Sequence, residues 1–366
     1  MVTVGVLFGG RSGEHDVSLC SAASVVSNLD PSRYRVVAIG IDREGRWFVQ
    51  ERPEIVDDKD FGRILKLDPR GSWSVNHYER GGKLVLTESG TGKSVEVDVV
   101  FPAVHGTFCE DGTLQGLLEL AGVPYVGADV AGSAIGMDKD VAKRLLRDAG
   151  IPTTPWVTVF ADVWRANGAG ILKEAIGKLG LPLFVKPANA GSSVGVKKAK
   201  DETSAREAVE YAFRYDTKVI IETAVDCREI ECAVLGNRDP RASVLGEIIP
   251  RHEFYSYEAK YIDPEGASLK IPAAVDEPLA GEIRSSAVEA FQVLCCSGMA
   301  RVDFFLEKGG TRYYLNEINT LPGFTTISMY PKLWNATGLA YGALLDRLIE
   351  LAFERAGEKK SLLTTR

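Results

Sequence analysis

The strongest constraint on the fold lies in the first 41 residues, where two apolar runs flank a glycine turn and a segment of helical periodicity. The runs TVGVLF (residues 3–8) and RVVAIGI (residues 35–41) have the apolar, β-branched character of buried strands. The glycine pair Gly9-Gly10 separates the first run from the helical segment. A strand, a helix and a second strand in this order favour a βαβ unit with a parallel sheet.

The rest of the sequence divides into further units. Short alternating pieces with turn signals follow from residue 42 to 98, and they predict β-hairpins inserted into the first domain. We therefore expect an α/β (α+β) protein in which an N-terminal parallel α/β domain precedes two α+β domains. The predicted bounds are residues 1–126, 127–224 and 225–366, with a long polar loop at 250–270 in the third domain.

Composition excludes several classes of function. The chain has 366 residues and 45% hydrophobic content, enough for several domains with a large core. Its 43 Lys and Arg against 50 Asp and Glu give a net charge of -7, and no basic stripe follows the chain, so we expect no nucleic-acid partner. No apolar run approaches the roughly 18 residues of a membrane span. We therefore expect a cytoplasmic protein without membrane contact.

Two glycine-rich segments imitate nucleotide-binding motifs. GTGKS (residues 90–94) lacks the leading glycine of a P-loop, because position 87 is Thr, and an apolar alternating segment follows it. A hairpin turn is the better interpretation. GVLFGGRSGEHDVS (residues 5–18) lacks the GxGxxG spacing of a dinucleotide fold, although its glycines would let a small ligand approach a helix N-terminus beside Glu14. A purely structural tight turn remains the alternative there.

The segment around Lys186 is more informative. This lysine ends the apolar run LFVKP and is followed by GSSVG (residues 191–195), so a cation and several backbone amides lie close together, as polyphosphate binding requires. A hairpin with an exposed lysine is the alternative. Lys139 begins the predicted helix 138–149, where the positive end of the helix dipole disfavours a cation unless an anion binds nearby.

The predicted strands ARVDFFLE (residues 300–307) and RYYLNEIN (residues 312–319) carry polar side chains that an ordinary apolar hairpin would not need. Glu317 and Asn319 share one face because they are two residues apart, and so do Arg301 and Asp303. Carboxylate and amide oxygens of this kind are typical ligands of Mg²⁺ held together with phosphate.

These segments together resemble the ATP-grasp superfamily and, within it, the bacterial D-alanine-D-alanine ligases. The matching motifs occur in the family's order over nearly the whole chain: LFGGRSGEHDVS, HGTFCEDGTLQG, MDKDVAK, FVKPANAGSSVGV, YEAKY, ARVDFF and NEINTLPGFTTISMYP. The resemblance implies the three-domain ATP-grasp architecture, with ATP gripped between the second and third domains. It also implies ligation of two D-alanines through an acyl phosphate for peptidoglycan precursor synthesis, by a homodimer.

The resemblance assigns roles to individual residues. Lys139, Lys186 and Lys260 hold ATP phosphates, the last from the loop at 250–270, which acts as a lid. Ser193 also binds ATP, Glu222 with the backbone near Val225 binds the adenine, and Glu229 binds the ribose. Two Mg²⁺ ions, with Mn²⁺ as a substitute, are bound by Asp303, Glu317 and Asn319. The residues implied in catalysis are Glu14, Ser192, Tyr261, Arg301 and Gly323, and those implied in substrate binding are His105, Tyr255 and Ser328. One departure from the family pattern is Cys227, where relatives often have glycine.

Alternatives remain at the level of substrate and class. Another ATP-grasp carboxylate-amine ligase would share the nucleotide and Mg²⁺ residues but lack the pair Glu14 and His105. A nucleotide-dependent binding or regulatory protein without turnover is a more distant alternative. It would not need both Arg301 and all three metal-binding residues. For the second substrate we expect D-alanine, with D-serine as the alternative. The chain keeps Tyr255, Lys260 and Tyr261, and it has Met329 rather than a basic residue beside Ser328.

Overall fold

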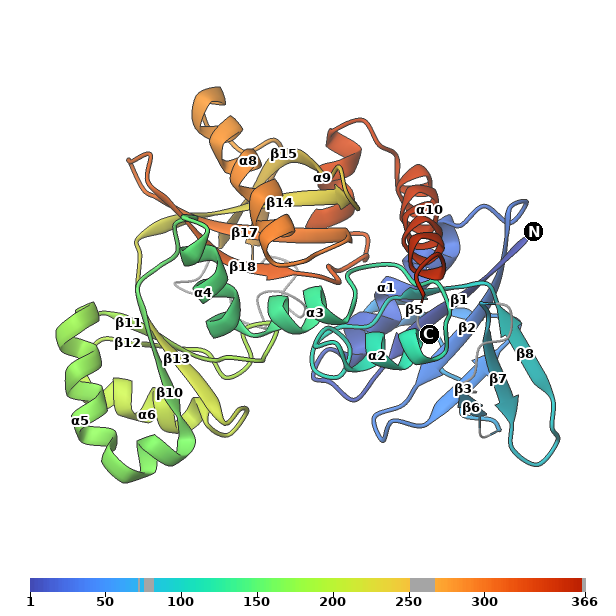
Figure 1. Cartoon of the computed structure of the whole chain (residues 1–366), viewed down its shortest axis with the longest axis horizontal. Coiled ribbons are helices and arrows are strands. Elements are labelled where there is room, and N and C mark those ends of the chain that lie inside the picture. The colour runs from blue at the N-terminus through green and yellow to red at the C-terminus, as the bar shows by residue number, and fades with distance from the viewer. Residues whose placement is uncertain (72, 76–81, 251–266, 364–366) are drawn as a thin grey trace.

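The computed structural model describes residues 1–71, 73–75, 82–250 and 267–363. In the described residues, three large sheets, each with its own helices, form three parts of the molecule, and a two-stranded hairpin makes a fourth, small sheet. Helices α3 (Val130–Met137) and α4 (Lys139–Asp148) run between the three parts (Figure 1). Among the described residues, no helix has the length and apolar character needed to cross a bilayer.

The N-terminal sheet is mixed. Its strand order is β8-β7-β6-β3-β2-β1-β9, and only the neighbours of β1 pair with it in parallel, which confirms the βαβ unit but confines the parallel part to three strands. The pairs β2/β3 and β7/β8 are antiparallel neighbours joined by short connections at residues 42–46 and 89–93, so they are hairpins of the expected kind. Its elements are β1 (Val2–Gly9), α1 (His15–Asn28), β2 (Tyr34–Ile41), β3 (Trp47–Gln50), β6 (Trp73–Val75), β7 (Leu84–Glu88), β8 (Ser94–Val97), β9 (Val99–Pro102) and α2 (Thr113–Leu120). A separate hairpin joins β4 (Ile55–Asp58) to β5 (Gly62–Leu65).

The GTGKS segment connects β7 to β8, which pair antiparallel from Leu84 and Val97 to Thr87 and Ser94. The hairpin interpretation is therefore confirmed, and the segment is not a P-loop.

The central sheet has the order β10-β13-β11-β12, and all its pairings are antiparallel. Two helices cover it and build a core with it, and one of them, α5, was not predicted from the sequence. The elements are β10 (Trp156–Phe160), α5 (Ala161–Leu179), β11 (Leu183–Pro187), β12 (Lys197–Ala199), α6 (Glu202–Ala212) and β13 (Lys218–Thr223).

The third sheet has the order β16-β15-β14-β17-β18 and is entirely antiparallel. Residues 267–270, which we expected in the polar loop, form strand β16 along the edge of β15, because an unpaired edge offers backbone partners to an extended segment. The elements are β14 (Cys227–Gly236), β15 (Arg241–Pro250), β16 (Ala267–Lys270), α8 (Glu277–Val293), β17 (Gly298–Glu307), β18 (Tyr313–Asn319), α9 (Met329–Ala336) and α10 (Tyr341–Lys360).

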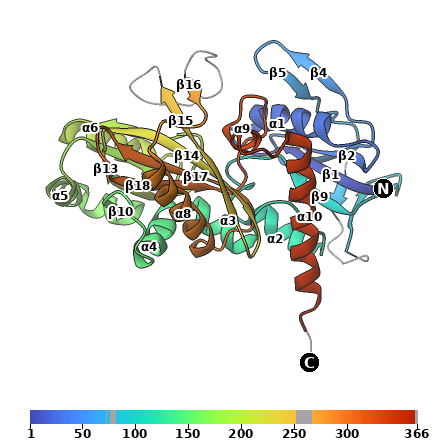
Figure 2. The ribbon, with the colours of Figure 1, turned by 90° about the horizontal axis from the view of Figure 1, so that it is seen from above.

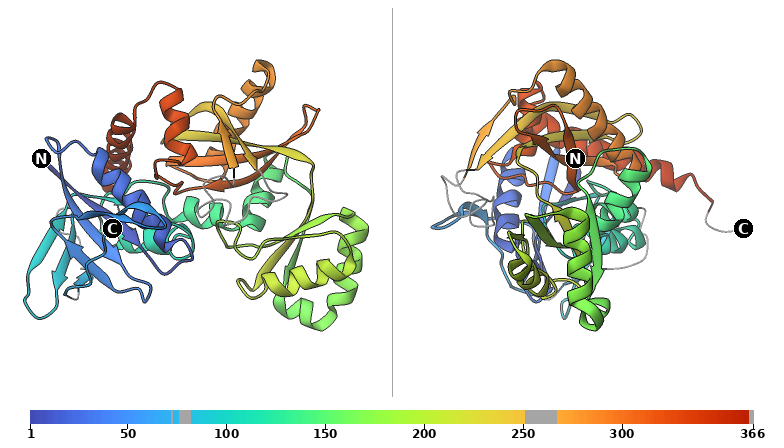
Figure 3. Two further views of the ribbon diagram at one scale, coloured as in Figure 1. Left: turned by 180° about the vertical axis from the view of Figure 1, so that it is seen from behind. Right: turned by 90° about the vertical axis from the view of Figure 1, so that its left-hand side faces the viewer.

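Two helices cross the predicted domain divisions. Ala142 and Leu146 of α4 belong to the core of the third sheet. The C-terminal helix α10 returns to the N-terminal sheet, where Leu344 and Leu348 join the same core as Val4. Figure 2 shows α10 lying beside α1 and β9, and Figure 3 shows its last turns extending away from the body. The domain bounds therefore stay a proposal, although the three sheets are distinct.

Candidate active site

The facing strands β17 and β18 bring four polar side chains together. In their antiparallel register, Arg301 lies opposite Asn319 and Asp303 opposite Glu317. The Nε and Nη2 atoms of Arg301 donate to the two carboxylate oxygens of Asp303 at 2.8 and 2.7 Å. Asn319 donates its side-chain N–H to the same carboxylate at 3.0 Å. The structure thus places the predicted metal residues and Arg301 on one face, as the spacing of two residues predicts.

The donor set of this face fits a hard cation. Mg²⁺ in proteins is usually held by one or two carboxylates, with water and phosphate oxygens completing its shell. Asp303 and Glu317 provide two carboxylates as cross-strand partners, and the amide of Asn319 adds a carbonyl oxygen. Among the residues that the structure describes, no three His, Cys, Asp or Glu side chains gather as a metal-binding group. An ion here would therefore depend on substrate oxygens as well as on the protein.

Lys139 connects this face to the glycine-rich loop. It is the first residue of α4, whose N-cap Asp138 accepts hydrogen bonds from two backbone amides. Its Nζ donates to the carbonyl oxygen of Ala190 at 2.7 Å and lies 3.5 Å from Oε2 of Glu317. A cation at the first turn of a helix is thus held between a loop carbonyl and an acid of the third sheet. This position suits a ligand phosphate that contacts both parts.

Lys186, at the end of β11, lies in a buried cluster with Glu222 of β13. The Nζ of Lys186 is 2.7 Å from Oε2 of Glu222 and donates to Oδ1 of Asn316 at 3.0 Å. The other carboxylate oxygen of Glu222, Oε1, lies 2.8 Å from Nζ of Lys143. Glu222 is only 2% exposed. The predicted adenine-binding carboxylate and a predicted phosphate-binding lysine are therefore in direct contact.

The charges of this cluster support one another. Burial alone would raise the pKa of Glu222, but the attraction of Lys143 and Lys186 lowers it to about 2. Burial also opposes the charge of both lysines. At Lys186 the combined attraction of Glu222, Glu317 and Glu229 outweighs burial and raises the pKa above its ordinary value. At Lys143 burial dominates and the pKa is lowered. The carboxylate is thus ionised in the folded protein at neutral pH.

Glu14 reaches the glycine-rich loop from the start of α1. Ser192 donates a hydrogen bond to its Oε1. A Cβ atom added to Gly106 or Gly191 would approach Oε2 of Glu14 to 2.6 or 2.9 Å, so both glycines are needed for this close approach. The N-terminal sheet therefore meets the central part of the molecule at the predicted pair of Glu14 and Ser192.

His105 is buried behind this contact. Its Nδ1 lies 3.1 Å from the carbonyl oxygen of Leu321, and its Nε2 lies 2.9 Å from Oγ of Ser21. Burial favours the neutral ring, but the carboxylate of Glu110, 3.8 Å from Nδ1, together with Glu14 and the Leu321 carbonyl outweighs it and raises the pKa of His105. Both ring nitrogens are therefore engaged by the protein, which links α1 to the segment that precedes Gly323.

Gly323 and Ser328 lie next to each other after β18. A Cβ atom on Gly323 would approach Oγ of Ser328 to 2.8 Å, and that hydroxyl accepts a hydrogen bond from the backbone of Thr325. Met329 is buried, and its sulfur would lie 2.7 Å from a Cβ atom on Gly246 of β15. The side chain of Met329 thus packs against β15 in the core, and the inference about the second substrate that used it stays a prediction.

The remaining predicted residues lie at the edge of this region. Val225 is in the connection from β13 to β14. Glu229 on β14 pairs with Phe305, whose ring centre is 5.7 Å from Nζ of Lys186.

Cys227 pairs with Glu307 as a strand residue and has no left-handed backbone, so the site does not need glycine there. Ser193 has a φ of 59° in the glycine-rich loop. Tyr255, Lys260 and Tyr261 lie outside the described residues.

Sequence analysis missed several polar residues that complete this region: Ser21, Glu110, Lys143, Glu231 and Asn316. One signal could have found Lys143. It follows Lys139 by four residues on a predicted helix, so both cations lie on one face, which a purely apolar packing surface would not tolerate. Glu231 gave no such signal, because its partner Arg301, 3.0 Å away, is distant in sequence.

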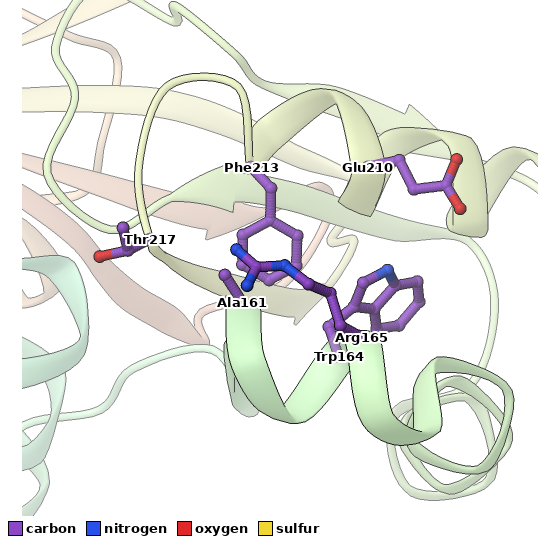
Figure 4. Close-up of a pocket in the computed structure, with 6 residues that line it drawn as sticks. All are labelled: Ala161, Trp164, Arg165, Glu210, Phe213 and Thr217. Atoms are coloured by element: carbon purple, nitrogen blue, oxygen red, sulfur yellow. The ribbon is translucent and has the colours of Figure 1, made fainter.

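A separate cavity of about 210 Å³ opens on the central part between α5 and α6 (Figure 4). The residues that line it are Ala161, Trp164, Arg165, Glu210, Phe213 and Thr217. None of them belongs to the predicted site, so this cavity does not contribute to it.

Comparison with known proteins identifies the family. Residues 3–128 match the family model described as the D-ala D-ala ligase N-terminus, and residues 145–350 match its C-terminus. A relative named D-alanine--D-alanine ligase A from Chromobacterium violaceum is 50% identical over 99% of this chain and 98% of its own length.

Two solved structures are similar to this one over nearly their whole length. The D-alanine-D-alanine ligase from Coxiella burnetii has a TM-score of 0.81 and 37% identity, and covers 98% of this chain and 97% of its own. The VanG D-Ala:D-Ser ligase from Enterococcus faecalis has a TM-score of 0.80 and 36% identity, over 96% and 99%. The family models, the sequence identity and the fold all indicate the same family, and the chain therefore belongs to the D-alanine-D-alanine ligase family.

Proposed function

We propose that this protein is an ATP-dependent ligase that joins two D-alanines into D-alanyl-D-alanine, with release of ADP and phosphate, for peptidoglycan precursor synthesis. One observation supports this most directly. Lys139 and Lys186 reach Glu317 and Asn316 of β18 from the central part of the molecule. Cations for phosphate thus meet a carboxylate face suited to Mg²⁺, which is the arrangement that phosphoryl transfer needs.

ATP binding is assigned to residues on both sides of this contact. Lys139 and Lys186 neutralise phosphate oxygens, and the loop with Ser193 offers backbone amides to them. Glu222 accepts a hydrogen bond from adenine together with the backbone near Val225. Glu229 accepts from the ribose hydroxyls. Lys260 approaches the γ-phosphate from the segment at 250–270, and its position is a sequence prediction.

Two Mg²⁺ ions, or Mn²⁺, are assigned to Asp303, Glu317 and Asn319. When bound, they neutralise the negative charge that builds up between two anions at the transferring phosphoryl group. Asp303 has a second role, because it accepts two hydrogen bonds from the guanidinium of Arg301 and so fixes its position. The Nε atom of Arg301 also lies 3.0 Å from Oε2 of Glu231, so two carboxylates fix this guanidinium.

The reaction has two steps. In the first, a carboxylate oxygen of one D-alanine attacks the γ-phosphorus, the bond to the bridging oxygen breaks, and ADP leaves. Glu14 binds the ammonium group of that D-alanine. We assign orientation of this substrate to His105, which acts through the Leu321 backbone. Arg301 and the amide of Gly323 hold the carboxylate.

In the second step, the neutral amine of the second D-alanine attacks the acyl carbon, loses a proton, and expels phosphate. Arg301 and the Gly323 amide then stabilise the tetrahedral oxyanion. Ser328 and Tyr255 bind the second substrate. A hydrogen-bonded set of Glu14, Ser192 and Tyr261 would exclude water, which otherwise hydrolyses the acyl phosphate.

Phosphate release tests the function. The purified protein is mixed with ATP, Mg²⁺ and D-alanine, and phosphate is followed over time, with L-alanine as the control. Release that requires D-alanine supports the proposal, and release that is independent of any amino acid contradicts it. The similarity to a D-Ala:D-Ser ligase makes D-serine the second candidate for the attacking amine. A competition at neutral pH with equal D-alanine and D-serine, resolved by mass, decides between them.

Three further expectations belong to this proposal. They are a homodimer, a cytoplasmic location where ATP is supplied, and domain bounds at residues 1–126, 127–224 and 225–366. Light scattering of the purified protein tests the first, and limited proteolysis with mass analysis tests the last.

A further inference from the structure

Glu222, which carries one negative charge, contacts two lysine side chains. Its Oε1 lies 2.8 Å from Nζ of Lys143, and its Oε2 lies 2.7 Å from Nζ of Lys186. The two lysines differ in access, because Lys143 is 1% exposed and Lys186 is 8% exposed. Lys143 is the inner partner and Lys186 is the one that reaches toward β18.

Lys143 is held in this position by three neighbours. Its Nζ donates to Oγ1 of Thr154 at 2.8 Å in addition to its contact with Glu222. It also lies 5.3 Å from the centre of the Trp156 ring, which attracts a cation. Thr154 is itself 1% exposed. Lys143 therefore cannot turn toward a ligand, and its charge is dedicated to this cluster.

In the proposed nucleotide site, Lys186 must bind a phosphate as well as Glu222. A phosphate that binds Lys186 competes with Glu222 for the same Nζ. A buried carboxylate that loses its only cation is strongly destabilised, so a single lysine could not serve both anions well. With Lys143 in place, Glu222 keeps a partner on its other oxygen while Lys186 turns to the phosphate.

We propose that Lys143 is a positioning residue that acts as the permanent counter-ion of Glu222 and thereby releases Lys186 to bind the nucleotide phosphates. The inference rests on the proposed assignment of Lys186 and Glu222 to ATP. It predicts an effect that depends on phosphate, since a ligand without phosphate does not compete for Lys186.

The test compares Lys143→Met with the wild-type protein in calorimetric binding of ATP, ADP and adenosine in the presence of Mg²⁺. We expect ATP and ADP to bind at least about tenfold more weakly, because Lys186 stays on Glu222, while adenosine affinity changes far less. In turnover, the KM for ATP should rise by more than kcat falls. Lys173→Met, which removes an exposed lysine charge from α5, is the control and should bind all three ligands as the wild type does. Equal weakening of adenosine and ATP, or no weakening of either, overturns the proposal.

A second comparison does not require Lys143→Met to fold. In the background Glu222→Gln there is no carboxylate charge for Lys143 to neutralise. The double variant Lys143→Met/Glu222→Gln should therefore bind ADP about as well as Glu222→Gln alone. A further loss of about tenfold or more in the double variant would show that Lys143 acts through another group, and would also overturn the proposal.

These experiments separate the inference from the proposed function. If the wild-type protein binds ATP but does not release phosphate with D-alanine, the ligase assignment fails, and the binding comparison still decides the role of Lys143. If ligation occurs and the phosphate-dependent loss is absent, only the role of Lys143 fails.

Discussion

Asp303 lies at the centre of the charged face on β17 and β18, where it contacts both Arg301 and Asn319. Asp303→Asn keeps the size of the side chain but removes one negative charge. We expect phosphate release to be lost, because the variant has a weaker metal site and holds Arg301 less firmly. The fold should remain, as judged by circular dichroism.

Glu307→Gln is a matched control on the same strand. Glu307 accepts a hydrogen bond from Tyr314 and lies at the far end of β17 from Arg301. Its conversion to Gln should leave phosphate release unchanged. Wild-type rates from Asp303→Asn, or equal losses in both variants, would show that the metal assignment is wrong.

His105 gives a prediction for the pH dependence of stability. Glu110 raises its pKa in the folded protein against the effect of burial. A raised folded-state pKa stabilises the fold fully below the ordinary histidine value of about 6.5, and the contribution is lost as the pH rises through the raised value. The free energy of unfolding of the wild type should therefore exceed that of Glu110→Gln by more at about pH 6 than at about pH 8.

The same variant should lower the pKa of His105 itself. Proton NMR titration can measure this directly, because the chain has only 4 histidines and their ring signals are separable. A stability difference that does not change with pH, or an unaltered His105 titration, would count against the role of Glu110.

At the scale of elements, Gly246 lets α9 pack closely on β15. A Cβ atom there would lie 2.7 Å from the sulfur of Met329 and 2.9 Å from Cδ2 of Leu333. Gly246→Ala should therefore lower the free energy of unfolding by about 1–3 kcal/mol, the usual cost of overpacking a core. Denaturant unfolding measures it. It should also raise the KM for the second substrate, because Ser328 precedes α9 directly.

Gly177→Ala in α5 is the control for this change. A Cβ atom at Gly177 meets nothing within 4 Å, and the residue is helical, so alanine should be neutral or stabilise by roughly 0.5–1 kcal/mol. Destabilisation of the two variants by the same amount would mean that the contact with α9 is not the cause.

Most elements with a clear period were predictable from the sequence, and those with a mixed surface were not. The βαβ unit, the helix after Asp138 and the strands with Asp303 and Glu317 followed from local patterns. Helix α5 was not predicted, because Gly168 and Gly170 and the non-helical Asn167 interrupt its pattern. Helix α10 was also not predicted, although its buried Leu344, Leu348 and Ala352 recur every four residues and its period was present in the sequence. In the site, residue types and spacing indicated the metal face. The pairing of Glu222 with Lys143, and of His105 with Ser21 and Leu321, could not be inferred, because these partners come from distant segments that meet only in the fold.

At the scale of the whole molecule, Arg355 of α10 ties several segments together. Its Nη2 donates to the carbonyl oxygen of Tyr125 at 2.7 Å, and its Nη1 donates to Oγ of Ser297 at 2.7 Å and to the carbonyl oxygen of Gly127. Arg355→Met leaves these acceptors without a charged donor. We expect a loss of about 1.5–3 kcal/mol in the free energy of unfolding, measured in urea.

Arg347→Met tests whether this loss is specific. Arg347 is on the same helix, but its partners Glu350 and Glu354 are surface residues. Exposed ion pairs contribute about 0–1 kcal/mol, so this variant should stay close to the wild type. If both arginines matter equally, the cross-linking role of Arg355 is wrong.

The return of α10 to the N-terminal sheet has a consequence for how the protein is made. Leu344, Leu345 and Leu348 fill part of the core that contains Val4 and Val6. The ribosome releases β1 and α1 first and the residues of α10 last. During synthesis, the nascent N-terminal segment must keep an open apolar surface until almost the entire chain has emerged. The core around the first strand to be translated is thus among the last to be completed. Until α10 packs against it, this apolar surface can be bound by chaperones that recognise exposed hydrophobic segments.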